Sequence, residues 1–192
     1  MSSGQKRMGF ALCGSFCTFS KVLEELSALA AEGWDLTPVM SYSAASIDTR
    51  FGNTDQIRQT VTKICGRPPL VSLTEVEPIG PKKLFDVLVV APATGNTLAK
   101  IAAGIADTPV TLAVKSHLRN DRPVVLAVST NDGLAGNAVS IGRLLARKHM
   151  YFVPFGQDAP LEKPNSLVAD FSRIGATAEL ALQGKQLQPL LL

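Results

Sequence analysis

The sequence predicts an α/β fold in which a parallel sheet carries helices on both faces. Two apolar runs rich in valine, 85–91 and 123–129, are typical of strands buried on both faces of such a sheet. Segments with helical spacing of apolar residues alternate with the apolar runs. At 192 residues, with 46% hydrophobic and 18% charged residues, the chain suffices for one well-buried domain. We therefore expect a single domain of the Rossmann-like or flavodoxin-like type.

The first half of the chain contains three expected strands and two expected helices. Gly33 and Gly66 each follow a helical pattern and are expected to end it, while Thr54 is expected to cap the second helix. In chain order the elements are a strand at 8–13, a helix at 20–31, a strand at 35–40, a helix at 54–65 and a strand at 85–91.

The second half continues the alternation up to the end of the domain. The loop 66–83 holds four of the twelve prolines and is long enough for a functional flap or an oligomer contact. Residues 1–6 are expected to be a disordered tail and 183–192 a C-terminal tail of the one domain that spans 1–192. The elements are helices at 98–105 and 109–118, a strand at 123–129, a helix at 137–149, a strand at 151–155, and a helix at 167–182 broken near Gly175.

Composition excludes several classes of function. The apolar runs end well before the roughly 18 to 20 residues that a membrane span needs, and the polar start 1–7 lacks the apolar core of a signal peptide, so we expect a cytoplasmic protein. Three cysteines cannot all pair and form no Cys-x-x-Cys motif, which predicts reduced thiols and no metal site. The net charge of +3 comes from scattered basic residues, which gives nucleic acid binding little support.

The segment 91–107, Ala-Pro-Ala-Thr-Gly-Asn-Thr-Leu-Ala-Lys-Ile-Ala-Ala-Gly-Ile-Ala-Asp, is the most informative in the chain. A buried strand runs into a small polar turn that opens a helix. Thr94, Asn96 and Thr97 offer hydroxyl and amide groups beside the unpaired amides of that helix. The segment therefore predicts a neutral polar cradle suited to the edge of a flat heterocycle; the alternative is ordinary helix capping.

Polar turns also follow the other expected strands. Gly14-Ser15-Phe16-Cys17-Thr18 after the first strand predicts an anion site, although it alternatively serves as a plain connection. Ser41-Tyr42-Ser43 closes the second strand where a dinucleotide fold would place an acidic residue, so a mononucleotide phosphate is favoured over a ribose diol. Ser129-Thr130-Asn131-Asp132-Gly133 follows the strand at 123–129. The turns after strands one, three and four are expected to meet at one edge of the sheet.

The segment 92–97, Pro-Ala-Thr-Gly-Asn-Thr, resembles the Pro-Ala-Ser-Ala-Asn-Thr signature of a family of FMN-binding proteins. The family includes phosphopantothenoylcysteine decarboxylase, lantibiotic cysteine decarboxylases and flavin prenyltransferases. The resemblance covers roughly residues 7–175 and includes the segments 14–19, 129–133 and 163–166. It implies FMN as the cofactor, bound by Gly14, Ser15, Phe16, Ser41, Ser43, Ala93, Thr94, Asn96, Thr97, Ser129 and Thr130.

Within this family the chain is most similar to the dipicolinate synthase branch of flavoproteins. That resemblance implies oxidation of a dihydro- or tetrahydrodipicolinate-type precursor to dipicolinate during sporulation, with Asn96 and Asn131 as catalytic residues that orient a small dicarboxylate substrate. It also implies a partner, the A subunit of dipicolinate synthase, with its own nicotinamide site (NADP), and a location in the mother cell of a spore-forming bacterium. Relatives commonly form trimers or trimer-built shells, so a homo-oligomer is expected.

Departures from the family pattern keep other functions open. Where the cysteine decarboxylases carry a catalytic histidine, this chain has Ser46, and only Asn131 is kept from their Pro-x-Met-Asn-x-x-Met-Trp segment. Neither His117 nor His149 is an obvious replacement, and both are interpreted as structural. An FMN-dependent decarboxylase or prenyltransferase-like enzyme is one alternative. The other is a non-catalytic FMN-binding scaffold for the A subunit.

Cysteines and cations add weaker candidates. Cys17 beside the first polar turn is either a nucleophile with a lowered pKa or, as we favour, an ordinary thiol, and Cys13 is expected in the core. Cationic side chains would suit a dicarboxylate, and at most one or two of four candidates are expected to hold one: Lys100, Arg119, Lys163 and Arg173.

Overall fold

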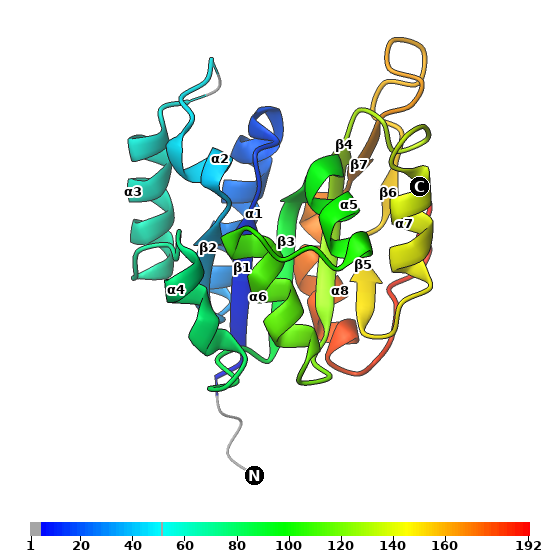
Figure 1. Cartoon of the computed structure of the whole chain (residues 1–192). Helices are drawn as coiled ribbons and strands as arrows, with labels where there is room; N and C mark the ends of the chain where they lie inside the picture. The colour runs from blue at the N-terminus through cyan, green and yellow to red at the C-terminus, as the bar shows by residue number, and fades with distance from the viewer. Residues whose placement is uncertain (1–4, 51) are drawn as a thin grey trace.

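A seven-stranded sheet lies between layers of helices in the computed structural model, which describes residues 5–50 and 52–192 (Figure 1). The strand order is β2-β1-β3-β4-β7-β6, and β5 pairs with the first half of β4. Strands β1 to β5 pair in parallel, whereas β7 runs antiparallel to both β4 and β6. The mostly parallel α/β fold is therefore confirmed. The strands are β1 (Arg7–Leu12), β2 (Asp35–Met40), β3 (Val87–Ala93), β4 (Val124–Thr130), β5 (Met150–Phe152), β6 (Phe155–Gly156) and β7 (Leu167–Ala169).

Helices cover both faces of the sheet, as expected from the alternation. Helices α1 and α8 pack on one face, against β3 and β4, and α5 and α6 lie on the other (Figure 1). The helices are α1 (Phe19–Ala31), α2 (Tyr42–Ser46), α3 (Thr54–Cys65), α4 (Leu73–Val76), α5 (Gly95–Ala103), α6 (Pro109–Leu118), α7 (Ala138–Leu145) and α8 (Ile174–Ala181), with 3-10 turns at Phe16–Thr18, Glu77–Ile79 and Phe171–Arg173.

Strands β3 and β4 form the centre of the core. Every residue of β3 is buried, and so is all of β4 up to Ser129. A strand with neighbours on both edges and helices on both faces has no polar side, which is why both segments consist mainly of valine, leucine and alanine. Their carboxyl ends are therefore held rigidly by the most buried part of the molecule.

The predicted helix over 167–182 is wrong in its first third. Leu167–Ala169 is strand β7, because Val168 pairs with Ser129 of β4 and Ala169 pairs with Phe155 of β6. Only Ile174–Ala181 is α-helical, so Gly175 lies near the start of that helix and not at a break. The expected strand 151–155 is likewise divided into β5 and β6, since Pro154 has no N–H for a ladder.

Other differences concern element ends. The cap of α3 is Asn53, whose Oδ1 accepts from the Asp55 amide at 2.9 Å, whereas the Thr54 hydroxyl donates to Asp48 at 2.7 Å. The helix expected at 98–105 begins earlier, at Gly95, and the one expected at 137–149 ends at Leu145. Loop 66–83 holds α4 and a 3-10 turn, and α2 follows β2 where no helix was expected.

Both tails make contacts with the domain. Of the tail expected at 1–6, residues 1–4 lie outside the described residues, whereas Lys6 pairs with Glu179 at 2.6 Å. In the C-terminal tail, Gln186 bonds to both backbone groups of Phe152, and the Leu192 amide donates to the Phe155 carbonyl at 3.1 Å. Within the described part of the chain, no helix is long and apolar enough to cross a membrane.

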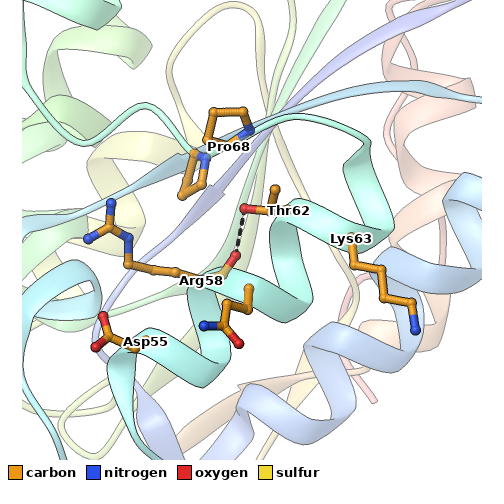
Figure 2. Close-up of a pocket in the computed structure, with 7 residues that line it drawn as sticks. Asp55, Arg58, Thr62, Lys63 and Pro68 are labelled. Atoms are coloured by element: carbon orange, nitrogen blue, oxygen red, sulfur yellow. Dashed lines mark hydrogen bonds between the residues drawn. The ribbon is translucent and has the colours of Figure 1, made fainter.

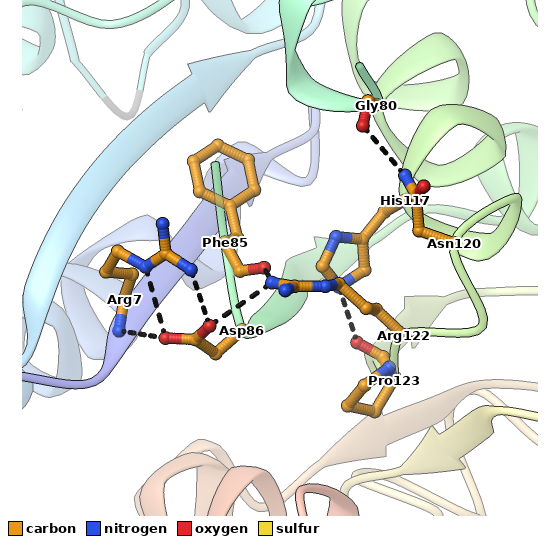
Figure 3. A network of polar contacts seen from close by, with 8 residues as sticks. All are labelled: Arg7, Gly80, Phe85, Asp86, His117, Asn120, Arg122 and Pro123. Carbon is orange, nitrogen blue, oxygen red and sulfur yellow. Dashed lines mark hydrogen bonds and ion pairs between the residues drawn. The ribbon is translucent and has the colours of Figure 1, made fainter. Parts of the chain in front are cut away.

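A polar network joins the amino ends of β1, β3 and β4, opposite the polar turns (Figure 3). Asp86 accepts hydrogen bonds from the backbone and guanidinium of Arg7, at 3.0 and 2.7 Å, and from Arg122 at 3.2 Å. Burial alone would raise the pKa of Asp86, but these donors hold it below its usual value. His117 is buried beside the network and bonds through Nε2 to the Pro123 carbonyl at 3.1 Å. These contacts hold the amino ends of the three strands together.

We expect His117 to make folding stability depend on pH. Burial, helped by the charge of Arg122, lowers the pKa of this imidazole to about 4. Because the folded pKa lies below the unfolded one, stability is intact above about pH 6.5 and falls as the pH drops toward 4, by up to roughly 3 kcal/mol. Urea unfolding of the wild type and His117→Gln, at pH 7.5 and 4.5, measures this. The variant should lose less stability between the two pH values, and equal losses would contradict the assignment.

Candidate functional site

The polar turns after β1 and β4 meet at the carboxyl edge of the sheet, as predicted. Ser15 follows β1 and Ser129 lies near the end of β4, and their hydroxyl oxygens are 2.8 Å apart. The two residues are 114 positions apart in the chain, so only the strand order β1-β3-β4 brings them together. Ligands of open α/β sheets usually bind at this edge.

A cavity of about 450 Å³ opens at this edge, between the ends of β1, β2 and β3 and the first turns of α5. Among the described residues that line it, none is acidic and one is cationic. Six of the predicted cofactor-binding residues line it together with three others: Gly14, Ser41, Tyr42, Ser43, Thr94, Asn96, Thr97, Lys100 and Thr108.

The side of the cavity formed by β1 and β2 is a cradle of hydroxyl groups. A Cβ atom at Gly14 would lie 2.9 Å from the Ser43 hydroxyl, so only glycine lets the end of β1 approach Ser43 this closely. The Ser41 and Ser43 hydroxyls are 3.2 Å apart, and Ser41 accepts from the amide of Ala44 to cap α2. Neutral donors in a confined space suit a phosphate oxygen.

The opposite side is the first turn of α5. The Thr94 hydroxyl caps this helix by accepting from the Thr97 amide at 3.3 Å. The Thr97 hydroxyl in turn donates to Cys13 Sγ at 3.3 Å, which ties α5 to the end of β1. Burial raises the pKa of Cys13 to about 11, so this thiol stays protonated and belongs to the core as expected. The first turn of α5 thus combines helix capping with a polar wall of the cavity.

Asn96 is the polar group that this first turn leaves free. Its side chain is exposed, lines the cavity and makes no hydrogen bond within residues 5–50 and 52–192. An amide that carries both a donor and an acceptor at a cavity wall is available to a ligand.

A carboxylate ties the turn after β4 to the residue that precedes α7. Asp132 accepts from the Thr130 hydroxyl at 2.5 Å and from Asn137 Nδ2 at 2.8 Å. A Cβ atom at Gly95 would lie 2.5 Å from Asn137 Nδ2 and 2.6 Å from the Thr130 hydroxyl. The absence of a side chain at Gly95 therefore allows this turn to dock on the start of α5.

Six of the predicted site residues do not line the cavity. Ala93 is completely buried, and the ring of Phe16 packs against Phe19 with centroids 5.3 Å apart. Thr130 uses its hydroxyl on Asp132, and Asn131 is exposed in the same turn without lining the cavity. Ser15 and Ser129 also lie outside the lining set, joined to each other.

Three residues near the cavity were missed by sequence reasoning. Thr108 caps α6 beside Pro109, a recognisable helix start, but nothing local places it across from α5. Tyr42 stands out in the sequence only as part of a strand end. Asp132 is recognisable as part of a polar turn, but its bonds to Thr130 and Asn137 depend on the folding of that turn.

Of the four cationic candidates, Lys100 alone lines the cavity. Lys163 pairs with Asp158 at 3.5 Å and Arg173 with Asp170 at 2.9 Å, and Arg119 is exposed on the C-terminal end of α6. Cys17 is exposed, with its sulfur 3.9 Å from the Ser15 hydroxyl.

A second cavity of about 450 Å³ lies over α3, as Figure 2 shows. Arg58, Thr62 and Lys63 project from one helix there, and the Thr62 hydroxyl donates to the Arg58 carbonyl at 2.7 Å. The turns after β1, β3 and β4 contribute nothing to its lining, so this groove is separate from the strand-end site.

Residues 1–160 match the protein family described as Flavoprotein. The chain belongs to this family. This flavoprotein is 42% identical over 186 residues to the B subunit of dipicolinate synthase from Bacillus subtilis (strain 168). The aligned residues cover 97% of this chain and 93% of the relative.

Solved structures agree with the family assignment. The crystal structure of the B subunit of dipicolinate synthase from Bacillus halodurans C superposes on the flavoprotein with a TM-score of 0.90 at 42% identity, covering 100% of this chain and 98% of that one. The FMN-dependent cysteine decarboxylase SpaF has the same fold, with a TM-score of 0.69 at 21% identity over 94% of this chain and 97% of its own.

Proposed function

We propose that this flavoprotein binds FMN at the strand-end cavity and acts as the flavin-binding component of a dipicolinate synthase. The substrate would be a dihydro- or tetrahydrodipicolinate-type precursor, and the product dipicolinate. The observation that carries the proposal is the similarity to the B subunit of dipicolinate synthase along almost the whole of both chains. The chemistry of the cavity supports it independently.

The lining residues fit FMN. Gly14, Ser41 and Ser43 form a neutral hydroxyl cradle that would hold the phosphate, and a Cβ atom at Gly14 would crowd it at 2.9 Å from the Ser43 hydroxyl. Thr94 and Asn96, on the α5 side of the cavity, would hold the edge of the flavin ring by neutral hydrogen bonds. The hydrogen bond between the Ser15 and Ser129 hydroxyls joins the turn after β1 to the end of β4.

The bound flavin would supply a two-electron acceptor, which takes a hydride at N5. The residues of the chain would hold the substrate ring flat against it, with the amide of Asn96 bonded to the reacting end and Asn131 approaching from the turn after β4. A tetrahydro precursor that carries a hydroxyl group first loses water. The dihydropyridine then loses one hydride and one proton to become aromatic. Among the described lining residues no side chain carries a carboxylate or an imidazole, so in this proposal the proton would pass to water.

The similarity also supports a set of partners. We propose a second polypeptide, the A subunit of dipicolinate synthase, whose nicotinamide site (NADP) would exchange electrons with the flavin, and a homo-oligomer of trimers or a trimer-built shell. We place the complex in the cytoplasm of the mother cell of a spore-forming bacterium.

Decarboxylation fits this cavity less well. Ser46, at the position of the decarboxylase histidine, donates its hydroxyl to the Tyr42 carbonyl at 2.7 Å and is no base. His117 lies at the opposite end of the sheet. The scaffold alternative differs in a measurable way, because a scaffold binds FMN but oxidises no precursor, either on its own or with the A subunit.

The visible absorbance spectrum of the purified chain, before and after FMN is added, tests the cofactor. Dihydrodipicolinate oxidation, followed with and without the A subunit, then tests the reaction. Bound flavin and precursor oxidation support the proposal. Failure to bind FMN even with the A subunit present would reject it, and bound flavin without any oxidation would leave the scaffold function.

Asn96→Ala is expected to lower the oxidation rate roughly 10- to 100-fold, because a hydrogen bond at the reacting end is lost. We expect a smaller effect on FMN affinity, since the hydroxyl cradle is intact. The matched control is Gln59→Ala, which removes an exposed amide from α3. Equal rates for the two variants would remove Asn96 from the catalytic set.

A further inference from the structure

Lys100 lies one turn beyond Asn96 on α5 and faces the same cavity. Residues four apart on a helix are neighbours on its surface, at about 5–6 Å between Cβ atoms. Among the described residues that line this cavity, Lys100 has the only cationic side chain and Tyr42 the only aromatic ring. A cation, an amide and an aromatic face around one cavity match an anionic, flat ring.

The ammonium of Lys100 is held at the cavity by Asp107. Its Nζ lies 2.9 and 2.8 Å from the two carboxylate oxygens of Asp107. The lysine side chain is 24% exposed, whereas Asp107 is 55% exposed and does not line the cavity. The bonds to Lys100 lower the pKa of Asp107, so this carboxyl group is ionised at neutral pH.

An ion pair of this kind exchanges partners at small cost. Solvent-exposed pairs contribute little to stability, since water competes for both charges. The ammonium has three N–H donors, so it can bond to a second carboxylate while it stays close to Asp107. Asp107 thus neutralises Lys100 in the free protein and can give up the ammonium to an arriving anion.

On the basis of the function proposed above, we propose that Lys100 binds one carboxylate of the substrate and so selects a ring dicarboxylate over less charged rings. Asp107 competes with the substrate for the ammonium. Asn96 then contacts the same ligand from the preceding turn. The FMN phosphate would lie in the hydroxyl cradle, so the cofactor does not need Lys100.

The test measures the dissociation constant of dipicolinate for the FMN-loaded protein, from the change in flavin absorbance or fluorescence. Lys100→Met is expected to weaken dipicolinate binding roughly 10- to 100-fold, the range for a lost charge-assisted hydrogen bond. FMN affinity should stay within about threefold, because the cradle is unchanged. Lys115→Met, which removes an exposed lysine from α6, is the matched control and should change neither constant.

Two further measurements separate binding from a structural role. Asp107→Asn frees the ammonium and should strengthen dipicolinate binding several-fold, opposite in sign to Lys100→Met. Pyridine-2-carboxylate, with one carboxylate, should bind the wild type more weakly than dipicolinate, and Lys100→Met should shrink that difference. Added salt should weaken dipicolinate binding to the wild type more than to Lys100→Met.

The outcomes distinguish this inference from the proposed function. Equal dipicolinate affinity in the wild type and Lys100→Met, or losses of the same size in Lys100→Met and Asp107→Asn, would overturn the role of Lys100 alone. A wild-type protein that binds FMN but no dipicolinate would overturn both the role of Lys100 and the proposed substrate.

Discussion

Ser15→Asp is expected to abolish FMN binding. The Ser15 hydroxyl lies 2.8 Å from that of Ser129, and Ser15 directly follows Gly14, which lines the proposed phosphate cradle. A carboxylate there would stand beside a phosphate that already carries negative charge. Two unit charges about 4 Å apart repel by roughly 4 kcal/mol near a protein surface, which corresponds to about a thousandfold in affinity. An absorbance titration with FMN measures the loss.

The control for this charge is Ser27→Asp, which places the same carboxylate on an exposed position of α1. It should bind FMN like the wild type. Ser15→Ala should lose much less affinity than Ser15→Asp, because it removes one neutral hydrogen bond without adding a charge. If Ser15→Asp binds FMN as tightly as Ser27→Asp, the phosphate does not lie at this turn.

Gly95→Ala is expected to destabilise the domain and to disorganise the cavity. Alanine is normally the better helix residue, by about 1 kcal/mol. Here the added Cβ atom would lie 2.5 Å from Asn137 Nδ2, 2.6 Å from the Thr130 hydroxyl and 2.9 Å from an Asp132 oxygen. Overpacking of this kind costs roughly 1–3 kcal/mol, so the steric effect outweighs the helix propensity. The shifted turn would also weaken FMN binding.

Gly142→Ala is the matched control for this change. Gly142 is exposed in α7, and a Cβ atom there would meet no atom within 4 Å. Its substitution should raise the free energy of unfolding by up to about 1 kcal/mol. Urea unfolding of both variants gives the comparison, with opposite signs expected. Stabilisation by Gly95→Ala with unchanged FMN affinity would show that the turn after β4 moves freely.

Much of the fold is predictable because burial leaves a local pattern in the sequence. The valine-rich segments 85–91 and 123–129 are central strands, shifted by one or two residues at their ends. The strand Leu167–Ala169 was missed because its local pattern does not distinguish a short strand from the start of a helix. Three apolar residues beside a helix continue its spacing as well as they form a strand, and the choice is made by the partners β4 and β6.

The candidate site is also predictable only in part. The turns that contain Ser15, Thr94 and Ser129 are recognisable from sequence, since parallel strands place their carboxyl ends at one edge. Which side chains face the cavity is a different matter. Thr108 and Lys100 line it, whereas Asn131 does not.

The sequence by itself determined the class of fold, the edge of the sheet that carries the polar turns, and the neutral chemistry of those turns. These properties follow from hydrophobic periodicity and turn-forming residues, which act over a few positions. Only the tertiary structure decided that Gly95 must lack a side chain, that Asp132 clamps the turn after β4, and that Lys100 reaches the cavity with Asp107 behind it. These depend on how helices and strands distant in the chain pack, and packing sets the direction of each side chain.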